Sequence, residues 1–225
     1  DLKPHAEATG MSKESTSRTR KPKRGQTREA LMAAALDLVV KKAPFSSLSL
    51  REVTKRAGVV PTAFYRHFPD MSALGLTLLD ESFRTLRHMM RQVRQEELPN
   101  ERMLRGSLEV YFNYVRNNRA HFLFVSKELA GGTPTMRNAI RREIRMFTNE
   151  LAMDMARFPF LNHVNAEDLQ MMAGLVVNNV TALTQEMLEL EEDDEFGQNQ
   201  VLGTAEKQLR LIYFGVGMWK SKPDQ

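Results

Sequence analysis

Residues 49–67 show the sequence pattern of two short helices. Their side chains include hydroxyl, guanidinium, phenol and imidazole groups. An arginine can donate two hydrogen bonds to a guanine or a phosphate, a threonine can contact a thymine methyl or a phosphate, and phenol and imidazole groups can donate to phosphates. Together with two arginines just upstream, this segment supplies ten predicted DNA-contacting residues: Arg24, Arg28, Ser49, Arg51, Lys55, Thr62, Ala63, Tyr65, Arg66 and His67.

Three of these residues also have ordinary explanations. Tyr65 can be a packed aromatic at the edge of a buried face, His67 can be a solvated side chain, and Lys55 can be a surface lysine. The whole set is therefore a stronger indication of DNA binding than any single member. A segment with this composition needs a scaffold that turns one side of it outward.

The second short helix, expected at 61–68, must hold its shape with one face and present donors with the other. At about 100° per residue, Pro61, Phe64 and Phe68 fall on one side and predict its buried face. The outward side then carries Thr62, Ala63, Arg66 and His67, with Tyr65 at the boundary. This outward side is the one expected to enter a DNA groove.

The first short helix has clear signals at both ends. Ser49 and Glu52 match a capping box, in which each side chain accepts a hydrogen bond from the other residue's backbone N–H. Gly58 suits the left-handed position after a helix end, and Pro61 opens the next helix with a preset φ. Two short helices joined by a tight glycine turn and packed on a preceding helix form a helix-turn-helix unit. A generic helical hairpin could look similar, but the polar and basic outward face favours DNA binding.

Charge is distributed unevenly along the 225 residues. The net charge is +4, yet residues 1–70 contain 14 Lys/Arg against 7 Asp/Glu, and the rest of the chain has a net charge of −3. A basic front indicates a polyanionic partner, although a solvated basic tail would produce much of this skew. We predict a disordered basic arm at 1–25, of which 1–10 precede Met11 and are expected to be an expression remnant. A helix-turn-helix domain should follow at 26–70, and a ligand-binding and dimerisation domain at 71–225.

Several function classes are disfavoured by composition. The chain has no cysteine, which excludes disulfides and thiolate metal sites and fits a reducing cytoplasm. No apolar run approaches the roughly 18 residues of a membrane span, so no membrane partner is expected. The histidines lack metal-ligand spacing, no glycine-rich loop follows a strand, and the acidic run 189–195 lacks the glycine of an EF-hand loop. We therefore predict a cytoplasmic protein that is not an enzyme and has no catalytic residue, metal site or cofactor.

Helical periodicity dominates the chain from residue 26 onward, and no segment shows sustained strand-like alternation. We expect an all-α fold of about nine helices, with a three-helix helix-turn-helix domain before a larger helical domain. After Asp70, helices are expected at 71–97, 101–117, 120–129, 134–157, 166–190 and 199–219. The last two are more apolar than one core requires, which predicts a homodimer formed through them. A two-fold dimer would place two DNA readers about 34–36 Å apart, matching a palindromic operator in double-stranded DNA.

Apolar and aromatic residues of the middle helices are candidates for a ligand pocket. Taken singly, each is more simply explained as core. Asn178 and Asn179 are different, because buried amides need hydrogen-bond partners; one of them could orient a ligand, bridge the dimer or face outward. The predicted pocket residues are Phe83, Leu86, Met90, Tyr111, Phe112, Val115, Phe122, Phe124, Phe147, Met171, Leu175, Asn178 and Asn179.

Three runs near the N-terminus resemble the DNA-binding domain of TetR-family regulators. They are Ser47-Leu48-Ser49-Leu50-Arg51-Glu52-Val53, Ala57-Gly58-Val59 and Phe64-Tyr65-Arg66-His67-Phe68. The sequence departs from the family at Pro61-Thr62, where many members have a small residue or glycine. The stretch 61–68, with Leu74-Gly75-Leu76-Thr77 and Asp80-Glu81-Ser82, resembles the FabR and DesT branch, which represses unsaturated fatty-acid synthesis and desaturase genes. This resemblance implies a repressor that binds a small-molecule effector among its middle helices and dimerises through its last two.

A long-chain acyl thioester, as acyl-CoA or acyl-carrier protein, is the effector that we expect. Burying each CH₂ contributes roughly 0.8 kcal/mol, so a long chain offers on the order of 10 kcal/mol. Shifting a two-state equilibrium from 1:99 to 99:1 takes about 5.5 kcal/mol of differential binding, which half of those contacts could supply. The alternatives are a TetR-type multidrug-sensing repressor of an efflux pump, for which buried carboxylates should face the pocket, and a helical scaffold that binds no DNA.

Overall fold

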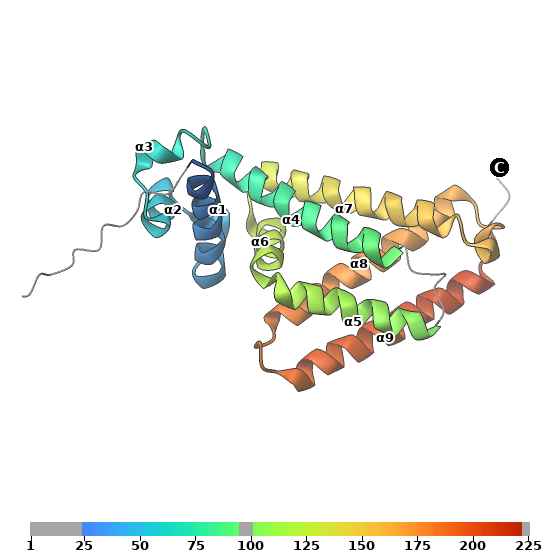
Figure 1. The fold of residues 1–225 in the computed structure, drawn as a ribbon. Helices are drawn as coiled ribbons and strands as arrows, with labels where there is room; N and C mark the ends of the chain where they lie inside the picture. Colours follow the sequence, from blue (N-terminus) through green and yellow to red (C-terminus); the bar gives the residue numbers. More distant parts are fainter. Residues whose placement is uncertain (1–23, 95–100, 222–225) are drawn as a thin grey trace, which may run out of the picture.

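The computed structural model describes residues 24–94 and 101–221, and these contain nine α-helices, two 3₁₀ turns and no strand (Figure 1). The elements are α1 Arg24–Lys41, η1 Phe45–Ser47, α2 Leu50–Ala57, α3 Pro61–Phe64, α4 Met71–Arg94, α5 Glu101–Asn117, α6 Arg119–Gly131, α7 Pro134–Met155, η2 Pro159–Leu161, α8 Ala166–Glu189 and α9 Glu195–Met218. The all-α prediction is confirmed. The predicted arm up to residue 23, positions 95–97 of one expected helix, and the side chains of Arg24 and Met90 lie outside the described residues.

Local hydrogen bonds set both ends of α2. The Ser49 N–H donates to Glu52 Oε2 at 2.9 Å and the Glu52 N–H donates to Ser49 Oγ at 3.2 Å, which confirms the predicted capping box. The Ser49 N–H and the Ser49 hydroxyl both donate to the Glu52 carboxylate and hold the pKa of Glu52 below its usual range. At the other end Gly58 has φ +68°, a left-handed conformation that glycine adopts without steric cost. The predicted turn is thus confirmed, and it sets the angle between α2 and α3.

The helices form a small unit at one end of an elongated body (Figure 1). The small unit consists of α1, η1, α2 and α3, and we call it the DNA-binding unit. From it α4 runs beside α7 into the body, where α5, α8 and α9 lie. Helix α6 stands between the two parts, because it packs on α1 and η1 as well as on α7 and α8.

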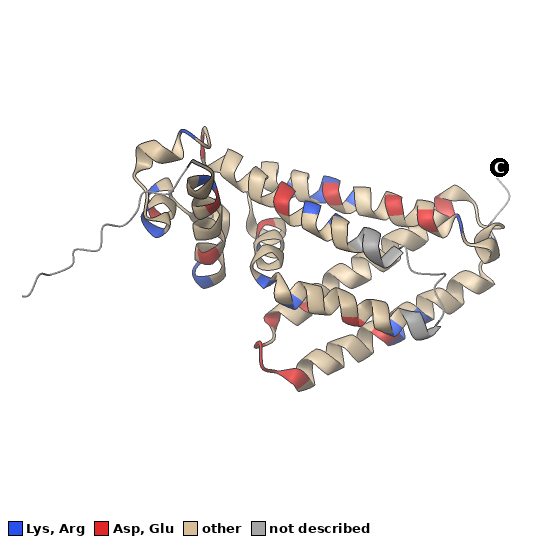
Figure 2. Ribbon diagram, in the orientation of Figure 1, with Lys and Arg blue, Asp and Glu red and all other residues tan. Residues whose placement is uncertain are grey.

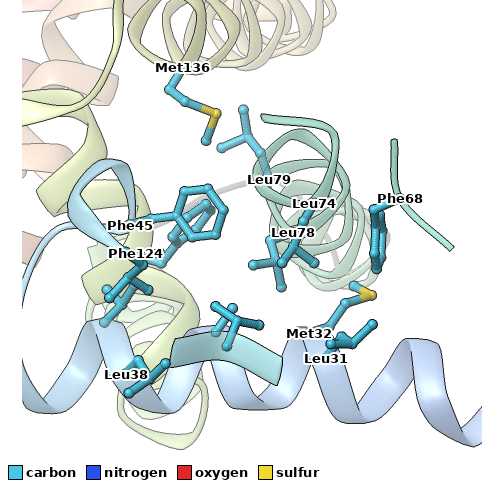
Figure 3. Packing of buried hydrophobic residues seen from close by; sticks show 14 of the residues in the cluster. Leu31, Met32, Leu38, Phe45, Phe68, Leu74, Leu78, Leu79, Phe124 and Met136 are labelled. Atoms are coloured by element: carbon cyan, nitrogen blue, oxygen red, sulfur yellow. The ribbon is translucent and has the colours of Figure 1, made fainter. Parts of the chain in front are cut away.

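One continuous hydrophobic core joins the DNA-binding unit to the body (Figure 3). Phe68 belongs to the unit, Leu78 to α4, Phe124 to α6 and Met136 to α7, and all four are buried in the same cluster. The core therefore crosses residue 70, where a domain boundary was predicted. Any reorientation of α1–α3 must consequently change contacts with α4, α6 and α7.

Two further clusters form the core of the body. One joins α7, η2, α8 and α9, and the other joins α5, α8 and α9. Within the described ranges, no helix has both the length and the hydropathy of a membrane span. Large apolar side chains remain exposed on the outer faces of the last two helices: Met171, Leu175, Leu211, Phe214 and Met218. The body thus has more apolar surface than its own core uses.

Candidate nucleic-acid interface and ligand cavity

The helix expected to carry five of the ten predicted DNA-contacting residues is shorter than predicted. Helix α3 ends at Phe64, whereas the apolar spacing predicted a helix through residue 68. The chain keeps turning after it, because the N–H groups of His67 and Phe68 both donate to the Phe64 carbonyl, at 2.9 and 3.0 Å. Pro69 disfavours the α region for Phe68 and so ends the turning segment at that residue. The order of inward and outward side chains is preserved in this tightened turn.

Two phenylalanines anchor the inner side of α3. Phe64 is fully buried, Phe68 nearly so, and their ring centroids lie 5.7 Å apart. The guanidinium of Arg28, on α1, lies 5.5 Å from the centroid of the Phe68 ring, in a cation–π contact. Arg28 is exposed, so α1 presents a cation next to the turn that follows α3.

The opposite side of this segment faces solvent. Thr62, Tyr65 and Arg66 are exposed, with 63% of the Tyr65 surface free, while Ala63 and His67 are half-buried. The exposed phenol and the exposed guanidinium, which are adjacent in the turn after α3, can both donate to phosphates or base edges. The structure therefore brings the five predicted residues of the second short helix to one outward surface.

Four cations of the DNA-binding unit and of the turn after α3 have no carboxylate within ion-pair distance in the described part of the chain: Arg28, Arg51, Lys55 and Arg66. Their neighbour Arg56 is different, because its Nε lies 2.7 Å from Asp37. In the body, lysines and arginines are interspersed with acidic residues (Figure 2). Cations that are not neutralised within the protein raise the local potential and are available to phosphates.

Ser49 caps the exposed N-terminus of α2, but its hydroxyl is already engaged. Its Oγ accepts from the Glu52 N–H and donates to Glu52 Oε2 at 2.8 Å. A phosphate at this position would therefore meet the free N–H groups of the first helical turn, which attract anions, and not the Ser49 hydroxyl.

A cavity of about 170 Å³ lies in the body among α4, α5, α6, α7 and α8. Five of the thirteen predicted pocket residues line it: Phe83, Leu86, Tyr111, Phe122 and Phe147. The other lining residues are Val125, Ser126, Leu129, Ile144, Leu151, Val176, Val177, Val180, Thr181, Thr184, Gln185 and Leu188. These were missed because tertiary packing, which the sequence does not display, decides which face of α6, α7 and α8 meets the cavity.

The other predicted pocket residues with described side chains do not line this cavity. Phe112, Val115 and Phe124 are fully packed in core regions. Met171, Leu175 and Asn178 are exposed on α8. Asn179 Nδ2 donates to Gln208 Oε1 of α9 at 2.5 Å. The physical reason is common to all seven: a helix with several apolar faces can turn only one of them toward a given cavity.

A second hollow, of about 290 Å³, lies between α5 and the facing ends of α8 and α9, with Phe112 in its wall. Glu109, Arg116 and Glu195 also line it, so its surface is charged. The Arg116 guanidinium donates to Gln198 within this wall. The hollow is therefore polar where the first cavity is apolar, and the first is the better candidate for a hydrophobic ligand.

Polar atoms in the apolar cavity are few and neutral. None of the described residues that line it carries a charge. The hydroxyls of Tyr111 and Thr184 lie 2.9 Å apart, and burial raises the pKa of Tyr111 to about 12, so the phenol stays protonated. Such a surface suits an apolar ligand with one or two hydrogen-bonding groups. A cationic ligand would lack a counter-charge there.

A half-buried histidine links α4 to α6. His121 Nδ1 lies 2.7 Å from Ser82 Oγ, and the Ser82 hydroxyl also lies 2.7 Å from the Leu78 carbonyl oxygen. Burial lowers the pKa of His121 below its ordinary value, and the negative charge of Glu81 opposes this effect. The neutral imidazole is therefore the form that this helix contact accommodates.

Acid is expected to destabilise the protein through His121. Because the folded pKa lies below the unfolded value of about 6.5, the unfolded chain takes up the proton first. The stabilisation is complete above about pH 6.5 and is lost as the pH falls toward the folded pKa. Urea unfolding between about pH 7.5 and 5.5 should show a smaller acid loss in His121→Gln than in the wild-type chain. Exposed His163→Gln is the control, and equal pH slopes for all three proteins would exclude this role.

A helix-turn-helix unit with an exposed cationic face, joined to a helical body with an apolar cavity, is the architecture of a ligand-responsive DNA-binding regulator. Two family models match the chain. The model for bacterial regulatory proteins of the tetR family matches residues 31–76, and the model for the tetracyclin repressor-like C-terminal domain matches residues 99–215. The chain belongs to the TetR family. Members of this family are transcription factors that bind DNA and small-molecule effectors, typically as dimers, and the chain is a regulator of this kind and not an enzyme.

Solved structures of TetR-type regulators share this fold at low sequence identity. A putative transcriptional regulator from Pseudomonas aeruginosa is 16% identical, with a TM-score of 0.67 over 90% of this chain and 97% of that one. The fatty acid degradation regulator FadR from Bacillus halodurans is 15% identical, with a TM-score of 0.62 over 85% and 96%. FadR from Bacillus subtilis, solved in complex with stearoyl-CoA, is 14% identical, with a TM-score of 0.61 over 82% and 96%. At these identities the likeness concerns the fold.

Proposed function

We propose that this regulator is a homodimeric repressor that binds a palindromic operator through α2 and α3 and responds to a long-chain acyl thioester. The observation that carries the proposal is that α4 belongs to both sites. Leu74 and Leu78 lie in the core that supports α1–α3, and Phe83 and Leu86, about one to three turns later, line the apolar cavity. A ligand that displaces Phe83 or Leu86 would therefore move a helix on which the DNA reader rests.

Dimerisation through α8 and α9 is supported by the apolar side chains that these helices expose. Leu211 and Met218 are 74% and 84% exposed and lie two turns apart on one face of α9. Leu175 adds a half-exposed leucine on α8. Isolated apolar side chains are common on protein surfaces, but a row along two adjacent helices is typical of a subunit interface.

The neutral, apolar cavity supports an acyl chain as the buried part of the effector. Its volume of about 170 Å³ is below the roughly 300–1,000 Å³ of sites for drug-sized ligands, so a long chain must widen it on entry. Widening would separate the helices that form the wall, which is how binding energy could be converted into movement of α4 and α6. The stearoyl-CoA complex of the Bacillus subtilis neighbour is consistent with this chemistry.

The resemblance to the FabR and DesT branch favours genes of unsaturated fatty-acid synthesis or desaturation as targets, and it rests on the motifs at 61–68, 74–77 and 80–82. One structural neighbour is instead named as a regulator of fatty-acid degradation. Control of synthesis genes and control of degradation genes would both use an acyl thioester as effector. Sequencing the operators that the protein binds distinguishes these two sets of target genes. A repressor of a multidrug efflux pump is the second candidate. It is disfavoured because the cavity has no described carboxylate to neutralise a cationic drug.

Arg66→Ala is expected to weaken operator binding by about 1–3 kcal/mol and to relax sequence preference at one base pair, if the guanidinium reads a guanine. Tyr65→Phe removes only a hydroxyl, so it should weaken all sequences by a similar factor. Fluorescence anisotropy with operator and single-base variants measures both effects. Exposed Arg157→Ala, at the far end of α7, is the matched control. Equal affinities for wild-type and Arg66→Ala proteins would remove Arg66 from the interface.

Val177→Phe is expected to block acyl binding and leave effector-free operator binding intact. Val177 lines the cavity, and a benzyl group there would occupy the space of an acyl chain. Calorimetry with stearoyl-CoA should show affinity reduced at least about 10-fold, since several buried methylene groups lose their place at roughly 0.8 kcal/mol each. Val110→Phe, an identical change at an exposed position of α5, should bind like the wild-type protein. If Val177→Phe binds stearoyl-CoA normally, the chain does not enter this cavity.

A further inference from the structure

Helix α6 directs two charged side chains into the DNA-binding unit. Lys127 Nζ donates to the Val39 carbonyl at 2.5 Å, and this carbonyl belongs to the last turn of α1, where partners within the helix are missing. Glu128 Oε1 accepts from the Ser46 N–H at 3.4 Å, and the carboxylate also accepts from the Phe45 N–H at the start of η1. The Lys127 side chain thus caps the end of α1, and the Glu128 carboxyl group caps the start of η1.

The other side of α6 forms part of the cavity wall. Its lining residues are Phe122, Val125, Ser126 and Leu129. At about 100° per residue these four fall within roughly a third of the helix circumference, and Lys127 and Glu128 lie on the opposite side. Because a helix of this length moves as one body, displacement of its cavity side must also displace the two caps.

A contribution to the stability of the core does not explain why a glutamate occupies position 128. Its side chain is fully buried, and its Oε2 has no hydrogen-bond partner in the described part of the chain. Burial raises the pKa of Glu128, and the N–H groups of Ser46 and Phe45 oppose this. Gly132 provides the space, since a Cβ there would lie 2.5 Å from Oε2. An apolar side chain of similar size is often at least as stabilising as a buried charge, so this carboxylate indicates another role.

Phe124 adds a buried aromatic contact to the two polar contacts of Lys127 and Glu128. Its ring is fully buried and meets the Phe45 ring edge-on, with centroids 5.7 Å apart. Phe124, Lys127 and Glu128 share the side of α6 away from the cavity, so one apolar and two polar contacts hold η1 and α1 to this helix. The contacts are made at three separate points and therefore define an orientation as well as an attachment.

We propose that Lys127 and Glu128 form a clamp through which α6 sets the orientation of the DNA-binding unit, and that occupancy of the cavity changes operator affinity through this clamp. Both are positioning residues, because neither lines the cavity nor lies on the outward face of α3. The second part rests on the proposed function of the cavity. The first part is independent of any effector.

Glu128→Leu tests the clamp in the full-length protein, with Glu128→Gln as the conservative variant. The leucine fills the site and removes the acceptor, so its melting temperature should equal or exceed that of the wild-type protein. Its operator affinity without effector should fall about 10-fold, and the ratio of affinities with and without stearoyl-CoA should approach one. The glutamine retains an acceptor oxygen for the Ser46 N–H. The Glu128→Gln protein should therefore keep most of the effector-free operator affinity and most of the response to stearoyl-CoA.

Arg119→Met is the matched control on the same helix, since Arg119 donates to the Leu188 and Leu190 carbonyls of the body at 2.7 and 3.1 Å. It should leave operator affinity unchanged. The clamp would be overturned if the Glu128→Leu protein bound the operator with wild-type affinity in the absence of effector. It would also be overturned if this variant melted at a lower temperature while its operator affinity and its response to stearoyl-CoA stayed unchanged. If stearoyl-CoA does not change operator binding by the wild-type protein, the proposed effector is wrong, and the clamp is then decided by the effector-free affinities alone.

Discussion

Phe64→Ala is expected to lower the free energy of unfolding by about 3–5 kcal/mol, the usual cost of truncating a fully buried phenylalanine. Phe64 has no exposed surface and packs against Phe68, so little surrounding structure can collapse into the space left by the ring. A loss of this size is a large part of the roughly 5–15 kcal/mol that stabilises a domain. Because the buried Phe64 ring anchors the inner side of α3 and so holds its outward face, specific operator binding should be lost as well.

Phe196→Ala is the control for this truncation. Phe196 is 74% exposed at the start of α9, and removing its ring should change the free energy of unfolding by about 0.5 kcal/mol or less. Chemical denaturation and anisotropy on the same samples separate stability from DNA binding. A Phe64→Ala protein with wild-type stability and wild-type operator affinity would show that α3 does not depend on its buried side.

Leu211→Glu is expected to convert the proposed dimer into monomers. Leu211 is the most exposed leucine among the described residues, and a partner helix would have to bury the new carboxylate without a counter-charge. Sedimentation should give the mass of one 25.8 kDa chain. Operator affinity should fall by about 100-fold or more, because two linked readers bind a palindrome with a high effective concentration and separate readers do not.

Val110→Glu places the same charge at an exposed position of α5, outside the α8 and α9 surfaces proposed for the interface, and should remain dimeric with unchanged operator affinity. A dimeric Leu211→Glu protein would move the interface away from this face of α9. A wild-type chain that sediments as a monomer would contradict dimerisation altogether.

Local chemistry made much of the fold predictable. Ser49, Glu52 and Gly58 are side chains whose preferred backbone contacts involve near neighbours, so their capping roles could be assigned without knowledge of the packing. The same holds for Asn165, which accepts from the Asp168 N–H at 2.8 Å and begins α8. The end of α3 was placed too late because Phe68 continues the apolar spacing of Pro61 and Phe64, although the chain from Tyr65 to His67 is a turn.

The cavity was only partly predictable, because its lining depends on how five helices turn. Phe83 and Phe147 were identified as large apolar side chains, but Phe124, chosen on the same ground, packs on Phe45 instead. Nothing in the local sequence distinguishes these cases. Glu128 was missed, although one signal was present: a carboxylate one helical turn after Phe124, on the same side of the helix as this large aromatic, is unusual.

Selection of bound duplexes from a library of palindromic DNA, followed by footprinting, tests the central claim most directly. The wild-type chain should enrich one palindrome and protect two half-sites about 34–36 Å apart, on the same side of the duplex. The protein with Thr62, Tyr65 and Arg66 all replaced by alanine should enrich none. Failure of the wild-type chain to enrich any sequence, or an unchanged footprint in the triple variant, would contradict the assignment of α3 as the DNA reader.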